Sequence, residues 1–228
     1  METTLSKKFH FISGLPRSGS TLLTSILYQN PLIHTEGDSN LAGLMWGAHQ
    51  SLCNNITLSA GRQDIAIKIV SDLPDAYYQH VDREVVIDKS RAWTTEPMVY
   101  LLKEYFVKPK VIVCTRNLDD IIKSFEMLFK RNDRYDFANS DYADGLRLSL
   151  EGLNNAIKFN DPSMFLFIDY NDVVDNTKDT LSSIYAFLEL PEYKHDLCNI
   201  INKSLYDDTQ YGLPTMHDVR QTISRSFV

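Results

Sequence analysis

The stretch FHFISGLPRSGSTLLTSIL, residues 9–27, joins a short apolar run, a turn with two glycines and a second apolar run of different period. The first run, FHFISG (9–14), has the length of a buried strand and ends in glycine. From residue 18 to residue 30, leucine and isoleucine recur at helical spacing, and Pro31 ends the pattern. Strand, turn and helix in this order predict an anion site, because backbone N–H groups of the turn and of the helix N-terminus can face one ligand.

The turn comes close to a nucleotide-binding pattern. In G-x-x-x-x-G-K-[ST], the glycines correspond to Gly14 and Gly19 and the hydroxyl to Thr21. The lysine is replaced by Ser20, and Arg17 lies inside the loop. Because that lysine neutralises the terminal phosphates of a nucleoside triphosphate, its loss argues against phosphoryl transfer. The planar fork of arginine suits a tetrahedral oxyanion, and a phosphosulfate, whose sulfuryl group carries less charge than a γ-phosphoryl group, fits this loop better.

Later parts of the chain repeat the alternation of strand and helix. Apolar runs predict three more strands: VVID (85–88), KVIVCT (110–115) and FLFIDY (165–170). Helical patterns lie around residues 97–106, 118–130, 142–158 and 177–188. This order predicts an α/β fold, a doubly wound parallel sheet flanked by helices, with its ligand at the carboxyl ends of the strands. We find no linker and expect a single domain over residues 1–228, which leaves open a missing C-terminal portion.

Composition and charge narrow the class of protein. The chain has 228 residues, of which 43% are hydrophobic and 23% charged, as in soluble globular proteins. A net charge of −7 argues against nucleic acid or an anionic membrane as partner, so the positive field for an anion must be local. Cys53, Cys114 and Cys198 have neither zinc-ligand spacing nor the arrangement of a disulfide framework. Residues 1–8 contain no signal segment and no apolar run reaches the length of a membrane span, so we expect a cytoplasmic protein.

Two motifs carry a resemblance to a known family. The run PRSGSTLL (16–23) after a strand resembles the 5′-phosphosulfate loop of sulfotransferases that use 3′-phosphoadenosine 5′-phosphosulfate. The second motif of that family is a strand ending in arginine with a serine eight positions later, and VIVCTRNLDDIIKSF (111–125) supplies Arg116 and Ser124. In the family this pair holds the 3′-phosphate. The resemblance therefore implies this donor, adenosine 3′,5′-bisphosphate as product and no metal, with the 5′-phosphosulfate bound by Arg17, Ser18, Gly19, Ser20, Thr21 and Leu22.

Two further stretches extend the resemblance over residues 9–191. FLFIDYNDVVDNTKDTLSSIYAFLELP (165–191) resembles a family segment that would place Tyr170 near the 3′-phosphate. VVIDKSRAW (85–93) resembles the segment in which the family has a lysine beside the sulfuryl group, which implies that Lys89 and Arg17 stabilise charge during in-line transfer. The motif layout is most similar to that of tyrosylprotein-type and bacterial sulfotransferases.

The general base is the least determined part of the site. Tyrosylprotein sulfotransferases have a glutamate after the first helix and its proline, and NPLIHTEGDSN (30–40) puts Asp38 at that position with Glu36 two residues earlier. Cytosolic sulfotransferases use a histidine just after the lysine segment, where this chain reads Ser90-Arg91-Ala92. That difference favours a carboxylate, whose pKa would be raised by burial, and leaves His34 as a lesser alternative.

The resemblance implies that the acceptor is a hydroxyl of a small molecule, a carbohydrate or a tyrosine peptide, and a homodimer is an open alternative to a monomer. The bridging cysteines of tyrosylprotein enzymes correspond to Thr35 and Ile87, which argues against that acceptor. Aromatic residues considered both for an acceptor pocket and for the core are Trp46, Trp93, Tyr77, Tyr78 and Tyr100.

Other functions remain open at this point. One alternative is a P-loop kinase or NTPase with a degenerate loop, for which Asp88 or Asp169, each at the end of an apolar strand, would support magnesium. Another is a catalytically inactive nucleotide-binding module. The segment after residue 200 has no strong pattern, and His217 or Arg220 would cover a bound nucleotide.

Overall fold

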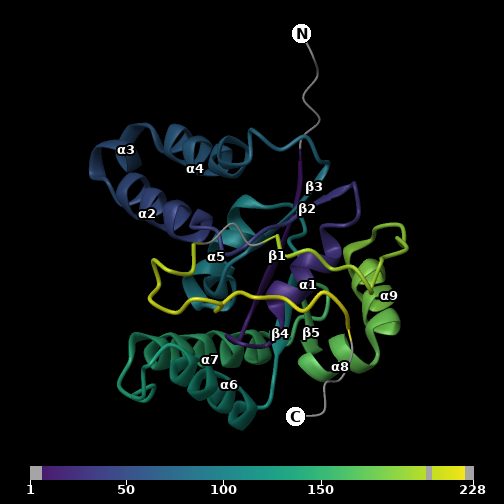
Figure 1. The fold of residues 1–228 in the computed structure, drawn as a ribbon. Helices are drawn as coiled ribbons and strands as arrows, with labels where there is room; N and C mark the ends of the chain where they lie inside the picture. Colours follow the sequence, from purple (N-terminus) through teal and green to yellow (C-terminus); the bar gives the residue numbers. More distant parts are fainter. Residues whose placement is uncertain (1–6, 204–206, 224–228) are drawn as a thin grey trace.

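A five-stranded parallel sheet forms the centre of the computed structural model, which describes residues 7–203 and 207–223. The strand order is β2-β3-β1-β4-β5, so the first strand is central (Figure 1). The strands are β1 (Lys8–Gly14), β2 (Ile33–His34), β3 (Val85–Lys89), β4 (Val111–Thr115) and β5 (Phe165–Asp169). The predicted doubly wound parallel sheet is confirmed, and residues 1–6, for which the sequence predicts no signal segment, lie outside the described part.

Helices cover both faces of the sheet (Figure 1). One face carries α1 (Ser20–Leu27), α8 (Tyr170–Asp175) and α9 (Thr177–Leu188). The other carries α2 (Leu41–Cys53), the 3-10 helix η1 (Arg91–Thr94), α5 (Glu96–Tyr105) and α7 (Asp141–Phe159). Outside these lie α3 (Ile56–Gly61) and α4 (Gln63–Tyr77) next to α2, and α6 (Leu118–Arg131) next to α7. In the described part of the chain, no helix is long and apolar enough to cross a membrane.

Successive residues of each central strand enter opposite cores. In β1, Phe11 packs against Trp93 with ring centroids 4.6 Å apart, whereas Ile12 belongs to the core under α1 and α9. In β4, Val111 and Val113 face the first core and Ile112 faces the second. Because both faces are covered, these strands are almost continuously apolar, and this explains why the sequence identified them.

A third core lies between α6 and α7 and includes part of the C-terminal segment 207–223, here called the strap. Leu213 of the strap is fully buried there. The Tyr142 hydroxyl donates to the Tyr211 carbonyl at 2.8 Å, and the Ile200 N–H donates to the Gln221 carbonyl at 2.8 Å. The strap forms no helix or strand, and it crosses the molecule in front of α1 (yellow in Figure 1). These bonds hold it over the carboxyl edge of the sheet.

Candidate active site

A cavity of about 540 Å³ lies where the central strands end. Pairing of Gly14 with Cys114 and of Ile12 with Lys89 aligns these ends, so the segments that follow the strands converge. The sequence-predicted residues that line the cavity are Arg17, Gly19, Ser20, Thr21, Leu22, Asp38, Lys89, Arg116, Ser124 and Tyr170. The structure therefore brings the residues expected to bind the 5′-phosphosulfate and those expected to bind the 3′-phosphate to one cavity.

The loop between β1 and α1 requires glycine at both ends. Gly14 has φ 121°, and a Cβ there would lie 2.0 Å from the carbonyl oxygen of Cys114. Gly19 has φ 82°, and its Cβ would lie 2.7 Å from Cδ2 of Tyr170. Helix α1 then begins without a side-chain cap and without an acidic residue in its first turn. Its first N–H groups are thus available to an anion, as the sequence predicts.

Ser18 differs from its neighbours in the loop. Its side chain is buried and does not line the cavity. The hydroxyl donates to the Leu15 carbonyl at 2.5 Å, which stabilises the turn. Its backbone N–H remains a candidate donor to a ligand.

Arg116 links β4 to the loop. Its Nη1 donates to the Arg17 carbonyl at 2.9 Å, and its guanidinium lies 4.1 Å from the centre of the Tyr170 ring. The Nε atom is buried and has no hydrogen-bond partner among the residues described. A buried donor without a hydrogen-bond partner destabilises the fold, so an anion that accepts a hydrogen bond from this Nε would offset that cost.

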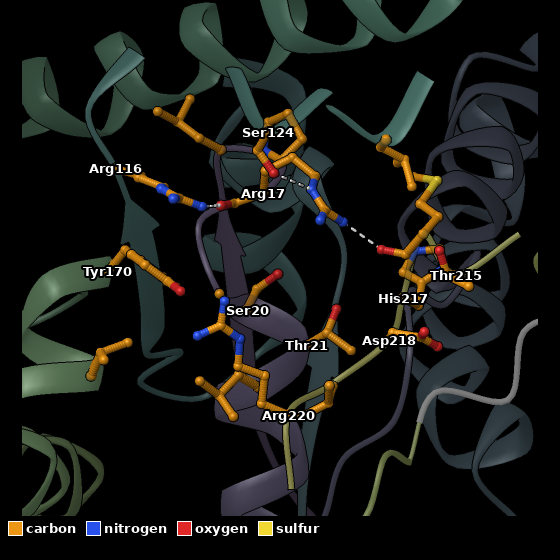
Figure 2. A pocket seen from close by; sticks show the side chains of 18 of the residues that line it. Arg17, Ser20, Thr21, Arg116, Ser124, Tyr170, Thr215, His217, Asp218 and Arg220 are labelled. Carbon is orange, nitrogen blue, oxygen red and sulfur yellow. Dashed lines mark hydrogen bonds between the residues drawn. The ribbon is translucent and has the colours of Figure 1, made fainter. Parts of the chain in front are cut away.

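Arg17 lies between α6 and the strap. Its Nε donates to the Ser124 hydroxyl at 3.1 Å, and its Nη1 donates to the Met216 carbonyl (Figure 2). Burial lowers the pKa of Arg17, and the nearby charge of Arg116 lowers it further. Figure 2 shows Arg116 and Tyr170 on one side of Arg17 and the strap residues Thr215 and His217 on the other. The cavity is thus bordered by the strap on one side.

Lys89 and Asp38 meet at the end of β3. The Lys89 side chain is almost fully buried, with its Nζ 3.1 Å from Thr21 Oγ1 and 3.7 Å from Asp38 Oδ1. Asp38 forms an isolated parallel bridge with Lys89, and the next residue, Ser39, donates its N–H to the Lys89 carbonyl at 2.8 Å. A buried cation, a hydroxyl of the phosphate loop and a carboxylate are therefore close together.

The loop that carries Asp38 is held by a buried carboxylate. Asp88 is fully buried and accepts hydrogen bonds from Ser39 Oγ (2.5 Å), Tyr78 Oη (2.6 Å) and Trp93 Nε1 (2.6 Å). Burial raises the pKa of Asp88, while these hydrogen bonds act in the opposite direction. Because both oxygens are engaged and neither faces the cavity, Asp88 is poorly placed for the magnesium-binding role considered from the sequence.

Asp169, the other carboxylate considered for magnesium, begins a helix instead. Its Oδ1 accepts the Asn171 N–H at 2.9 Å and so caps α8. Asp169 does not line the cavity. Neither strand-terminal carboxylate thus faces the cavity.

The two other candidate bases lie away from the cavity. Glu36 Oε2 is 3.5 Å from His34 Nε2, and neither residue lines the cavity. The His34 ring packs near Tyr28 and Tyr78, with centroids 6.0 and 5.6 Å away. Among the three candidates, Asp38 alone borders the cavity.

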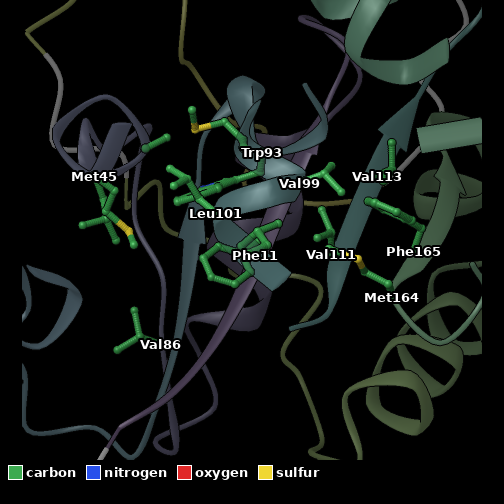
Figure 3. Close-up of a cluster of buried hydrophobic side chains, with 14 of the residues drawn as sticks. Phe11, Met45, Val86, Trp93, Val99, Leu101, Val111, Val113, Met164 and Phe165 are labelled. Carbon is green, nitrogen blue, oxygen red and sulfur yellow. The ribbon is translucent and has the colours of Figure 1, made fainter. Parts of the chain in front are cut away.

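The aromatic residues considered for an acceptor pocket have other positions. Trp93 and Tyr78 are buried in the core between the sheet and α2, α4 and α5 (Figure 3 shows Trp93). Tyr100 is half exposed, and Trp46 and Tyr77 pack against the edge of the same core. The core interpretation holds for Trp93 and Tyr78, and none of the five lines the cavity.

Sequence reasoning missed several cavity residues. Arg131 and Met127 lie on the same face of α6 as Ser124, seven and three residues further on, a periodicity that could have identified them. Arg91 follows Lys89 by two residues. His217 and Arg220 do line the cavity, as expected, whereas residues 204–206 and 224–228 of the segment after residue 200 lie outside the described part.

A parallel sheet with a glycine loop between its first strand and helix, and basic side chains at the carboxyl edge, defines a P-loop α/β protein. A sequence model described as "Sulfotransferase family" matches residues 10–195. The chain belongs to the sulfotransferase family.

Solved structures support the same fold. The sulfotransferase domain from the curacin biosynthetic pathway shares 16% identity at a TM-score of 0.58, covering 98% of this chain and 82% of that one. The sulfotransferase domain of the Synechococcus PCC 7002 olefin synthase shares 18% identity at 0.58, covering 100% and 92%. The Alicyclobacillus acidocaldarius sulfotransferase shares 14% identity at 0.58, covering 84% and 85%. No curated protein matches this sequence.

Proposed function

We propose that the protein transfers a sulfuryl group from 3′-phosphoadenosine 5′-phosphosulfate to an acceptor hydroxyl by in-line displacement. One observation carries this proposal: Arg116 and Ser124 meet the phosphate loop through Arg17, beside Tyr170, in the cavity that also contains Lys89. The buried Nε of Arg116, unpartnered within the described chain, fits a phosphate at the 3′ position. A nucleotide with a 5′-phosphosulfate and a 3′-phosphate would present one anion to the phosphate loop and the other to Arg116 and Ser124.

The side chains divide into binding and reacting groups. When bound, the donor supplies an activated sulfuryl group that leaves the 5′-phosphate as the acceptor oxygen attacks. The N–H groups of the loop and of the first turn of α1 would hold the 5′-phosphosulfate, and Arg116 and Ser124 the 3′-phosphate. Lys89, fixed by the Thr21 hydroxyl, would stabilise negative charge on the transferring and leaving oxygens. Asp38 would accept the proton of the acceptor hydroxyl.

Ligand-induced stabilisation tests the donor class. Adenosine 3′,5′-bisphosphate should raise the melting temperature, with about 2.7 kcal/mol of stabilisation at a hundred times its dissociation constant. ATP with Mg²⁺ should have a much smaller effect, and transfer should continue in excess EDTA. Stabilisation by ATP with Mg²⁺ alone, or transfer that requires added magnesium, would reject the proposal in favour of a kinase or NTPase.

Arg116→Ala should weaken the binding of adenosine 3′,5′-bisphosphate far more than the binding of adenosine 5′-monophosphate. The lost charge-assisted bond to the 3′-phosphate is worth roughly 1.5–3 kcal/mol, whereas disturbance of the Arg17 loop affects both nucleotides. Titration calorimetry gives the ratio of the two affinities. Arg147→Ala is the control, because Arg147 is an exposed arginine of α7 outside the cavity. This substitution should leave the affinities for both nucleotides unchanged. Equal losses for both nucleotides would show that Arg116 does not bind that phosphate.

The proposal includes a location in the cytoplasm, a reducing compartment. The free thiols of Cys53, Cys114 and Cys198 are compatible with the proposed cytoplasmic location.

A further inference from the structure

The cavity concentrates positive charge in an acidic protein. Its lining contains six lysine or arginine side chains and only two carboxylates, whereas the whole chain carries a net charge of −7. These residues are Arg17, Lys89, Arg91, Arg116, Arg131 and Arg220, with Asp38 and Asp218. The cavity therefore has a local excess of positive charge in a chain whose net charge is negative.

The proposed donor does not account for all of these cations. Arg17, Lys89 and Arg116 are assigned to its phosphates and sulfuryl group, and Arg220 extends from the strap toward Ser20 (Figure 2). Arg91 and Arg131 are left over. Within residues 7–203 and 207–223, neither of these two guanidinium groups forms a hydrogen bond or an ion pair.

Arg131 lies away from the position assigned to the 3′-phosphate. It follows Ser124 by seven residues on α6, which corresponds to about 10.5 Å along the helix axis. Its charge still contributes to lowering the pKa of Arg17, although less than burial and Arg116 do. Arg131 is exposed and also lines the cavity, so its guanidinium group is accessible to a ligand that enters from solvent.

Arg91 lies at the start of η1, two residues after Lys89 in the sequence. Its carbonyl accepts the Ser13 hydroxyl at 3.0 Å, which fixes this part of the backbone against β1. A Cβ on Gly145 of α7 would lie 3.7 Å from its Nη1, so the side chain extends toward α7. Arg91 is half-buried and its guanidinium is anchored by neither a carboxylate nor a carbonyl of the described residues.

Apolar side chains also line the cavity. Leu15, Pro16, Met127, Leu128 and Met216 line it together with the two arginines. A ligand here would have apolar atoms against these side chains and an anionic group against the guanidinium groups, which bind carboxylate and phosphate in a fork geometry. Its hydroxyl would be near Asp38 and Lys89.

We propose that the acceptor is an amphipathic hydroxylated anion, whose carboxylate or phosphate monoester is bound by Arg91 and Arg131 while an apolar segment lies between that group and the reacting hydroxyl. This inference rests on the proposed function and specifies its substrate class. Arg91 and Arg131 then determine specificity and take no part in the chemistry of transfer.

Matched acceptors test the proposal. The probes are 3-(4-hydroxyphenyl)propanoate, its methyl ester and 4-hydroxyphenethyl phosphate, each assayed with labelled donor. The parent should use at least one of the anions with a kcat/KM about tenfold or more above that of the neutral ester, since a bond to a charged group is involved. Arg91→Gln and Arg131→Gln should each reduce this preference by lowering kcat/KM for the anions while leaving that for the ester nearly unchanged.

Lys130→Gln is the matched control. Lys130 is the neighbour of Arg131 on α6 and also exposed, but it borders the groove between α6 and α7 and not the cavity. Its substitution removes the same charge from the surface and should preserve the preference. Loss of preference in this variant as large as in Arg131→Gln would overturn the proposal, because a general surface field would then explain it.

A binding measurement covers the case in which none of the probes is a good acceptor. Equilibrium dialysis of the protein saturated with adenosine 3′,5′-bisphosphate should show tighter binding of an anion than of the ester, and the two arginine variants should lose the difference. Equal use or equal binding of anions and ester, or no measurable binding of either anion, overturns the proposal. Stabilisation by adenosine 3′,5′-bisphosphate, measured on the same preparations, reports the proposed function separately.

Discussion

Asp38→Asn should slow sulfuryl transfer by about 10²–10⁴-fold, the usual effect of losing a general base, while nucleotide affinity changes little. Asparagine keeps the size of the side chain and the bridge between residue 38 and Lys89, but its amide cannot accept the proton of the acceptor hydroxyl. Single-turnover rates with labelled donor, together with titration of adenosine 3′,5′-bisphosphate, separate chemistry from binding.

Glu36→Gln provides the control for this substitution. Glu36 is two residues away in the same loop, lies beside His34 and does not line the cavity, so we expect nearly parental rates. A slow Glu36→Gln enzyme beside a fast Asp38→Asn enzyme would make Glu36 the base. Activity in both variants would make His34 the next residue to change.

The pH response distinguishes the base from the cation next to it. With a phenolic acceptor, Asp38→Asn should recover part of its activity at high pH, because the acceptor then ionises without help. Lys89→Ala should also be slow, but high pH should not restore its activity, since the lost function is stabilisation of charge.

Gly14→Ala should lower the free energy of unfolding by more than about 3 kcal/mol, among the larger effects of single substitutions. The added Cβ would lie 2.0 Å from the Cys114 carbonyl oxygen, so β1 and β4 would have to separate, and alanine is strained at φ 121°. Urea denaturation followed by circular dichroism measures the effect, and nucleotide-induced stabilisation should be lost with it.

Gly47→Ala is the same chemical change at a permissive site. Gly47 is exposed in the middle of α2, and an added Cβ would have no atom of the described residues within 4 Å, so alanine should stabilise the protein by up to about 1 kcal/mol. A Gly14→Ala protein with parental stability would show that β1 and β4 are not in the close contact described above.

The central sheet could be predicted because its strands are apolar on both sides. VVID, KVIVCT and FLFIDY became β3, β4 and β5 within one residue at either end. The two-residue strand β2 has no such signal, since it is defined by pairing with β3. In α4, Ile65, Ile67 and Ile69 alternate as in a strand, and Pro74 lies inside the helix. The local sequence pattern therefore did not indicate a helix there.

The part of the site that depends on spacing could also be predicted. The distances along the chain from Gly14 to Thr21 and from Arg116 to Ser124 are fixed by a turn and by two turns of helix, so local geometry brings these residues together. The course of the strap could not be predicted, although His217 and Arg220 line the cavity as expected. Isolated hydrogen bonds to distant residues and the burial of Leu213 hold the strap in place, and its sequence shows no regular hydrophobic period. For the same reason the role of Arg91 beside α7 depends on tertiary packing that no local pattern encodes.

The central position of β1 has a consequence for synthesis on the ribosome. Among the strands of the sheet, β1 is synthesised first, whereas its two neighbours begin only at Val85 and Val111. Both edges of β1 therefore remain unpaired while the intervening chain is synthesised. The anion loop takes its shape from the second neighbour, because the Leu15 N–H donates to the Cys114 carbonyl at 2.9 Å. We therefore expect the loop to reach its folded shape, and to become able to hold the proposed nucleotide, only after β4 has left the exit tunnel.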